Sequence, residues 1–174
     1  MAPVDIDKKK SDLILNEIEK RRLREKTVDV EEEKVKLVIF LLLDEYYAFY
    51  GVAVKEILPS ANIFYVPGSP DFITGVINVR GDIESVININ KLLGLPDSRI
   101  TQKSRIAVAV NGNMRSGILL DAIEDVIDAP LSSIKPPLST LEGSKKDFIT
   151  GELFYNNRNI TVLDVEKIFG RIMA

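Results

Sequence analysis

The side chains best suited to chemistry in this sequence are four acidic residues in its second half: Asp121, Glu124, Asp125 and Asp128. Clustered carboxylates serve many enzymes as general acid and base. No residue suited to act as a nucleophile or base stands beside these four, and the chain contains neither histidine nor cysteine. Thiol catalysis, phosphohistidine chemistry and thiolate or imidazole metal sites are therefore excluded. Because apolar residues alternate with the acids, we interpret the segment as a strand edge or a short helix with one polar face.

Short motifs with a known chemistry are missing as well. The sequence contains no Walker loop, dinucleotide fingerprint or calcium-binding loop. The run Ser144-Lys145-Lys146 is interpreted as a solvated loop, because nothing around it supplies catalytic geometry. We therefore expect no enzyme activity, no metal and no cofactor.

Arg80 is the most informative charged residue, because it ends an apolar stretch immediately before a glycine. An arginine held at the end of a strand presents a planar head with five donors to a partner's carboxylate or carbonyl groups. An internal salt bridge explains the same residue equally well. Its acceptor would be Asp82, Glu84 or Asp121. The residues alone leave both interpretations open.

Short β-strands are the elements that must position Arg80. Segments rich in valine and isoleucine, broken by turn residues, predict strands over 35–43, 47–51, 74–80, 83–89, 105–110, 114–120, 150–155 and 160–163. Gly81-Asp82 predicts a tight hairpin turn. Short helical turns are expected over 90–93 and 164–169, each followed by a glycine.

The pentapeptide DFITG occurs twice, at 71–75 and at 147–151. Aligned without gaps, segments 71–94 and 147–170 share eight of 24 residues. Segment 48–58 also matches 117–127, at an offset of 69 instead of 76, which places about seven extra residues in the loop 132–146. The sequence therefore predicts an internal duplication. Because a small sheet with one apolar face leaves sticky edges unless it closes, we expect two tandem small β-barrels with a groove between them.

The first 34 residues differ from the rest and are interpreted as a charged, partly helical extension. Residues 1–36 hold ten basic and ten acidic residues and no aromatic residue. Leu13, Ile14, Ile18 and Leu23 recur roughly at helical spacing. A solvated tail explains this segment, and an amphipathic helix that docks on a partner or an anionic membrane surface is the alternative.

Composition limits the remaining classes of function. The net charge is −3, so no overall positive field favours nucleic acid. The apolar runs are too short for a secretory signal or a membrane span. We therefore expect a cytoplasmic protein without direct membrane insertion.

Residues 66–81, VPGSPDFITGVINVRG, resemble the signature of the CheW family of bacterial chemotaxis coupling proteins. The shared features are a Pro-Gly-x-Pro loop, an aromatic-x-x-Gly step and the most specific segment, Asn-x-Arg-Gly. Residues 47–58 resemble the family's first hairpin, and Gly117–Asp121 resemble a Gly-aliphatic-Asp step of its second half. The resemblance covers residues 36 to 172.

The resemblance implies an all-β fold of two SH3-like barrels within 35–172, with interleaved halves of roughly 35–104 and 105–172. It implies a non-enzymatic adaptor that bridges the histidine kinase CheA to methyl-accepting chemoreceptors in membrane-associated arrays. Ring assembly with other CheW-like domains is a further possibility that it raises. The isolated regulatory domain of a CheA kinase has the same fold and is one alternative. The other is a small-barrel nucleic-acid-binding module that uses Lys55 and Arg80.

The resemblance also implies two sets of binding residues. A receptor's helical tip would lie in the groove between the barrels, against Val54, Gly75, Arg80, Ile106 and Ile123. Gly75 would let the partner's helix approach closely. The kinase's regulatory domain would contact Glu56, Ile57 and Leu58 with nearby apolar residues. One departure stands in the strand after Arg80, where Ser85 and Asn88 replace the family's proline and aspartate.

Overall fold

The computed structural model describes residues 5–27, 32–60, 62–139 and 143–174. The chain divides into two units, Met1–Glu33 and Lys34–Ala174.

The first unit contains one helix, α1 (Asp5–Thr27). Its described apolar side chains Leu13, Ile14 and Leu15 are exposed and consecutive, so they point in different directions around the helix. An amphipathic docking helix needs one apolar face, and the described side chains of α1, residues 11–23, do not form one. In the described residues, no helix combines the length and the apolar character needed to span a bilayer.

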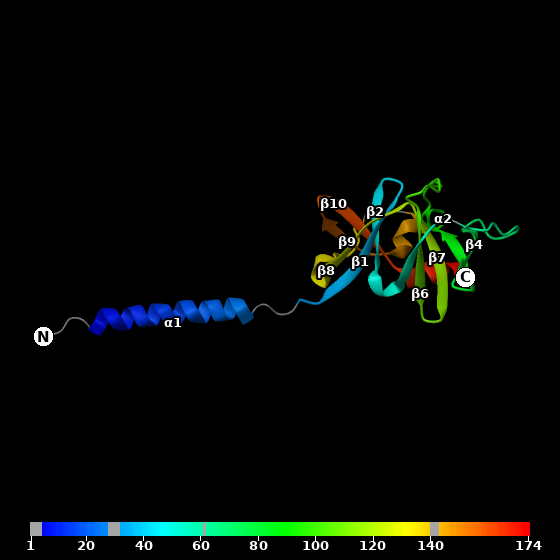
Figure 1. The fold of residues 1–174 in the computed structure, drawn as a ribbon. Coiled ribbons are helices and arrows are strands. Elements are labelled where there is room, and N and C mark those ends of the chain that lie inside the picture. The colour runs from blue at the N-terminus through cyan, green and yellow to red at the C-terminus, as the bar shows by residue number, and fades with distance from the viewer. Residues whose placement is uncertain (1–4, 28–31, 61, 140–142) are drawn as a thin grey trace. The chain divides into compact units, whose positions relative to one another are not determined.

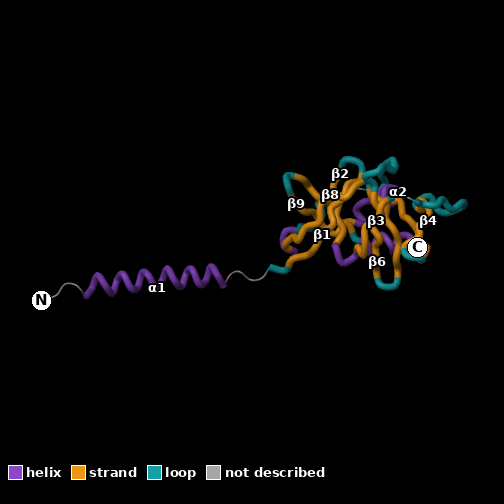
Figure 2. The backbone as a smooth tube through the Cα atoms, in the orientation of Figure 1, coloured by secondary structure: helices purple, strands orange, loops and turns teal. Residues whose placement is uncertain are grey.

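The second unit consists mainly of strands with short helices between them, as Figure 2 shows. Its first sheet has the order β8 (Ala122–Pro130), β1 (Lys34–Leu42), β2 (Glu45–Tyr50), β10 (Arg158–Leu163) and β9 (Ile149–Tyr155). Its second sheet has the order β3 (Val54–Pro59), β6 (Arg105–Asn111), β7 (Met114–Leu120), β5 (Asp82–Asn88) and β4 (Ile73–Val79). Each sheet therefore takes strands from both halves of the sequence (Figure 1).

Short helical elements lie between these strands and after the last one. The α-helices are α2 (Ile89–Leu93) and α3 (Val165–Met173), and the 3₁₀ turns are η1 (Gly51–Ala53), η2 (Leu131–Ser133) and η3 (Ser144–Phe148). Part of the predicted insertion, 140–142, lies outside the described residues.

The repeated segments form the same series of elements, β4-β5-α2 and β9-β10-α3. When the strands are matched by the repeat, both sheets have the same strand order. Unpaired bulge residues also fall at matching positions, Thr74 with Thr150 and Lys55 with Glu124. Bulges sit where a strand must bend, so the two sheets bend at the same places.

Backbone pairing closes neither sheet among the described strands, whereas the sequence predicted closed barrels. Side chains span the remaining gaps. In the first sheet the Tyr155 hydroxyl donates to Asp125, 3.2 Å away, and Arg158 lies 2.6 Å from Glu124. In the second sheet Arg80, just beyond β4, lies 3.2 Å from Glu56 of β3.

The main hydrophobic core lies between the two sheets and joins them. It contains Phe40 and Phe49 of the first sheet, whose ring centroids are 4.6 Å apart, with Ile118 of the second sheet and Phe169 of α3. Smaller apolar clusters lie within each sheet. The two sheets therefore fold as one body around a shared core.

The sequence did not predict β3, and it left β8 open between a strand and a helix. Both carry charged residues at their bulges, which interrupts the alternation of apolar and polar residues that marks a strand. The acidic segment 121–128, left open between strand and helix, begins at the end of β7 and continues as β8.

At the start of β2, the buried Tyr47 donates a hydrogen bond to the exposed carboxylate of Glu45. The Tyr47 hydroxyl donates to Glu45 Oε2 at 2.5 Å, and Lys145 Nζ lies 3.0 Å from the same oxygen. The hydrogen bond from Tyr47, helped by Lys145, holds the pKa of Glu45 below its ordinary value of 4.5. Burial and the hydrogen bond to Glu45 raise the pKa of Tyr47 well above its usual range.

Replacing Tyr47 with phenylalanine is expected to lower the free energy of unfolding at pH 7 by about 1 kcal/mol, because Glu45 loses its donor and is largely solvated. A lowered folded-state pKa stabilises the protein above the unfolded value and loses that effect as pH falls through the folded value. The deficit of Tyr47→Phe should therefore be full above about pH 5 and shrink below the ordinary value of 4.5. Urea unfolding at pH 7 and pH 3 measures it. An equal deficit at both values would remove Glu45 from the explanation.

Candidate docking surfaces

Arg80 lies at the tip of the β4–β5 hairpin in a left-handed backbone conformation, with φ of 53°. Gly81 follows with φ of 96°, and its amide donates to the Asn78 side chain at 2.8 Å. Two consecutive positive φ values are typical of the tight turns that match the twist of a hairpin. The turn therefore projects the Arg80 side chain outward, where 84% of it is exposed.

The internal partner of Arg80 is Glu56, and the acceptors predicted from sequence are wrong. The guanidinium donates to Glu56 Oε2 at 3.2 Å, and only 18% of the Glu56 side chain is exposed. Asp82 and Glu84 face Arg115 instead. The pair joins a predicted receptor residue to a predicted kinase residue. Most of the Arg80 head remains in solvent, so the ion pair orients it without using up its donors.

Each of the four acidic side chains in segment 121–128 contacts other residues of the fold. Asp121 Oδ2 accepts from the Leu43 amide at 2.6 Å and from Ser98 Oγ at 2.8 Å. Glu124 pairs with Arg158, Asp125 accepts from Tyr155, and Asp128 pairs with Lys36. The four carboxylates thus face four different sets of partners. Within the described residues, no group of three or more acidic side chains could hold a metal ion.

Two predicted receptor residues occupy matching positions on edge strands. Val54 begins β3 and Ile123 lies near the start of β8, each just before the bulge residue of its strand. Both are half-buried against the shared core. Each therefore keeps part of its apolar surface available to a partner.

Ile106, unlike Val54 and Ile123, has no exposed apolar surface. It is completely buried among Val86, Val108 and other residues of the second sheet's own cluster. The prediction that it lines a groove for a partner is therefore wrong. From the sequence, an apolar strand residue that faces a core looks the same as one that faces a groove.

Gly75 is also buried, and the chain itself explains why it is a glycine. Phe64 crosses it, with hydrogen bonds of 2.8 Å in both directions between Phe64 and Val76. A Cβ at position 75 would overlap the Phe64 carbonyl oxygen and lie 2.9 Å from Ile63 Cγ2. Gly151 has the same relation to Lys135 in the other sheet. The space is filled by this chain and not by a partner's helix.

The predicted kinase residues alternate along β3. Glu56 and Leu58 are half-buried, and Ile57 faces the opposite side with 36% exposure. Leu58 lines a pocket of about 380 Å³, which we call the Phe64 pocket. Its lining residues are Leu58, Pro59, Asn62, Phe64, Ile77 and Asn78.

Phe64 is a candidate site residue that the sequence analysis did not identify. Phe64 is 63% exposed, and Tyr65 beside it is 74% exposed. Ile83, also exposed, pairs across the hairpin with Asn78 of the Phe64 pocket. Exposed aromatic residues are enriched at protein interfaces. The signal was available as the run Ile-Phe-Tyr-Val in a loop immediately before the Pro-Gly-Ser-Pro segment.

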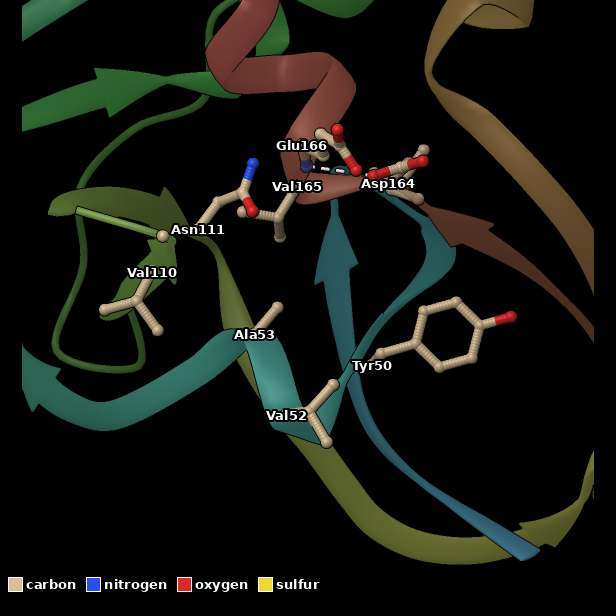
Figure 3. Close-up of a pocket in the computed structure, with 10 residues that line it drawn as sticks. Tyr50, Val52, Ala53, Val110, Asn111, Asp164, Val165 and Glu166 are labelled. Atoms are coloured by element: carbon tan, nitrogen blue, oxygen red, sulfur yellow. Dashed lines mark hydrogen bonds between the residues drawn. The ribbon is translucent and has the colours of Figure 1, made fainter. Parts of the chain in front are cut away.

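A second pocket, of about 380 Å³, lies between the two sheets, and we call it the inter-sheet pocket (Figure 3). It is lined by Tyr50, Val52, Ala53, Val110, Asn111, Gly112, Leu163, Asp164, Val165 and Glu166. These residues come from β2, η1, the end of β6, the β6–β7 turn, the end of β10 and the start of α3. Figure 3 shows Val52 and Ala53 on η1 facing Asp164 and Glu166 across the open space. None of the predicted binding residues lines it.

A model of the CheW-like domain family matches residues 36–173, nearly the whole of the second unit. The chain belongs to the CheW-like domain family. It is 31% identical to the chemotaxis protein CheW of Bacillus subtilis over 139 residues, which cover 78% of this chain and 87% of that protein. It is 27% identical to the CheW of Treponema pallidum, over 80% of this chain and 85% of that protein.

A solved structure gives the same result for the fold. The crystal structure of the scaffolding protein TtCheW from Thermoanaerobacter tengcongensis matches with a TM-score of 0.69 and 28% identity. The match covers 76% of this chain and 86% of that one. The chain is thus a CheW-type chemotaxis coupling adaptor, and the resemblance seen in the Asn-x-Arg-Gly segment is confirmed.

Proposed function

We propose that the chain couples methyl-accepting chemoreceptors to the histidine kinase CheA by binding both, without catalysing a reaction. The observation that carries this proposal is the match to the CheW-like family over residues 36–173. In this account the protein is recruited to membrane-associated receptor arrays through its partners. Ring assembly with other CheW-like domains is part of the same proposal. The alternative of an isolated CheA regulatory domain has no observation in its favour.

The architecture proposed is an internal duplication of two SH3-like barrels. The equal strand orders and the matching bulges support it. Each sheet, with its own apolar cluster and its edges tied by side chains, would be one barrel that remains open along the backbone. A duplicated body gives an adaptor two similar surfaces that can diverge toward different partners.

We place the receptor surface at Val54, Arg80 and Ile123. The two aliphatic residues keep exposed apolar surface on edge strands, and Arg80 presents its donors from the β4–β5 hairpin of the same sheet as Val54. A helical tip bound in this way would set apolar residues on Val54 and Ile123 and acceptors on Arg80. Gly75 and Ile106 are buried, and they influence binding only by stabilising the structure of the second sheet.

We place the kinase surface at the Phe64 pocket with Glu56, Ile57 and Leu58. Support comes from the exposure of Phe64 and Tyr65 and from the apolar lining of the pocket. An aromatic anchor beside an apolar pocket is the usual composition of an interface hot spot. The ion pair between Arg80 and Glu56 joins this surface to the receptor surface.

Replacing Phe64 with serine is expected to weaken binding of the CheA regulatory domain by about tenfold or more, because an apolar anchor is lost. The fold should persist, since only the backbone of Phe64 pairs with β4. Isothermal titration with the purified regulatory domain measures the effect. Phe154→Ser is the matched control, because Phe154 is 71% exposed on the other sheet. If both variants bind as the wild type does, the kinase surface lies elsewhere.

A further inference from the structure

The internal repeat matches the residues that line the inter-sheet pocket to residues at a second place in the same body, which we call the counterpart. The two sets of residues are matched by the offsets of 69 and 76 residues between the copies. At the counterpart, another segment of the chain occupies the space. Four lining residues of the pocket are Val52, Gly112, Asp164 and Glu166. Their counterparts, in the same order, are Asp121, Leu43, Asn88 and Asn90.

The chain fills the counterpart with its own segment 95–98. Asn90 Nδ2 donates to the Pro96 carbonyl at 2.9 Å and to Ser98 Oγ at 2.7 Å. Ser98 donates in turn to Asp121 at 2.8 Å. Asn88 donates to the Asp97 carboxylate at 3.0 Å. This segment therefore crosses the start of α2 and is held mainly by side-chain donors and acceptors.

The inter-sheet pocket stays open because α3 ends differently from α2. Helix α2 stops at Gly94, whose φ is 69°, and Pro96 then prevents it from continuing. Helix α3 passes through Gly170 and continues to Met173, with Ile172 packed against the shared core. No described segment therefore returns across Glu166 as segment 95–98 returns across Asn90.

The pocket presents hydrogen-bond acceptors where its counterpart presents donors. Carboxylates of Asp164 and Glu166 stand where the amides of Asn88 and Asn90 donate, so donors have become acceptors. No lysine or arginine is among the described residues that line the pocket. Among the described ion pairs, none involves Asp164 or Glu166. An occupant that carries a cation would complement this charge.

The partial positive charge at the start of α3 does not repel such a cation. Asp164 Oδ1 accepts from the amides of Glu166 at 2.9 Å and Lys167 at 3.4 Å, so the helix supplies its own cap. Two full negative charges outweigh the half positive charge of a helix start. Val52, Ala53 and Val110 provide apolar walls for the aliphatic stem of a lysine or arginine (Figure 3).

We propose that the inter-sheet pocket binds a short extended segment of a partner protein that carries a lysine or arginine. The segment crosses the start of α3 as 95–98 crosses the start of α2, with its cation between Asp164 and Glu166, where the counterpart places a carbonyl and a carboxylate against Asn90 and Asn88. This binding uses none of the residues of the proposed receptor or kinase surfaces. The chain would then have a third docking position, specific for basic segments.

The probe is the peptide acetyl-Gly-Leu-Pro-Lys-Ser-Gly-amide, which copies segment 95–98 with lysine in place of Asp97. The matched acidic peptide carries glutamate at that position. Each is titrated into the ¹⁵N-labelled full chain. We expect saturable amide shifts at Val52, Ala53, Asn111 and Glu166 with the lysine peptide, and binding about tenfold weaker with the glutamate peptide.

Glu166→Gln should weaken binding of the lysine peptide about tenfold, because one carboxylate is lost. Asp44→Asn removes the same charge from an exposed turn and should leave binding unchanged. The spectra report the fold of each variant directly. Absence of saturable shifts at the pocket, equal binding of the two peptides, or an unaffected Glu166→Gln variant would each overturn the proposal.

Discussion

Gly75→Ala is expected to lower the free energy of unfolding by about 3 kcal/mol, the upper part of the range for overpacking a buried site. The added Cβ would overlap the Phe64 carbonyl oxygen, which accepts from the Val76 amide at 2.8 Å. The Phe64 amide donates to the Val76 carbonyl at 2.8 Å, so Phe64 cannot move away without losing both hydrogen bonds. Gly75 has no positive φ, so the effect is purely steric. Urea unfolding followed by circular dichroism measures it.

Gly170→Ala is the matched control. Nothing lies within 4 Å of a Cβ at that helical position. Alanine there should stabilise the protein by about 0.5 kcal/mol, since glycine is a poor helix former. Gly75→Ala should also weaken receptor and kinase binding together, in proportion to the unfolded fraction. A Gly75→Ala protein as stable as the wild type, but selectively defective in receptor binding, would restore the interpretation that a partner's helix occupies this place.

Arg80→Ala is expected to leave the fold intact and to weaken receptor binding at least about tenfold. The side chain is 84% exposed, and exposed ion pairs contribute about 1 kcal/mol or less to stability. Charge-assisted hydrogen bonds to a partner contribute about 1.5 to 3 kcal/mol, which corresponds to tenfold or more in affinity. Circular dichroism and co-sedimentation with receptor membranes measure the two effects separately.

The pair with Glu56 allows a sharper version of this test. The double variant Arg80→Glu with Glu56→Arg restores an ion pair between the edges of the second sheet but reverses the charge at the hairpin tip. If the Arg80 head binds the receptor, the double variant should remain defective. Recovery of receptor binding would show that the ion pair itself is required, and that Arg80 acts by fixing β3 in place.

Much of the fold was predictable from local signals. The hairpin at Gly81 was predictable because a glycine turn stands between two apolar stretches. The repeat was visible as DFITG, and both copies fold into the same series of elements. The adaptor class could be predicted because the Asn-x-Arg-Gly segment and the missing catalytic residues both indicate a CheW-like coupling protein. The family match confirms this prediction.

Features that depend on distant segments were not predictable. The reason for Gly75 is the return of Phe64 across β4, and the partner of Arg80 is set by the meeting of two sheet edges. Gly94 and Gly170 occupy matching positions but behave differently, because Pro96 stops one helix whereas Ile172 gains contacts by continuing the other. The inter-sheet pocket results from that difference.

We propose that this chain bridges two proteins, a chemoreceptor and CheA. The most direct test of this proposal is sedimentation of receptor-containing membranes with purified CheA, in the presence and absence of the chain. We expect more CheA in the pellet when the wild-type chain is present, and we expect the chain itself to be in the pellet. Arg80→Ala should remove both effects. An amount of sedimented CheA that is the same with and without the chain would contradict it.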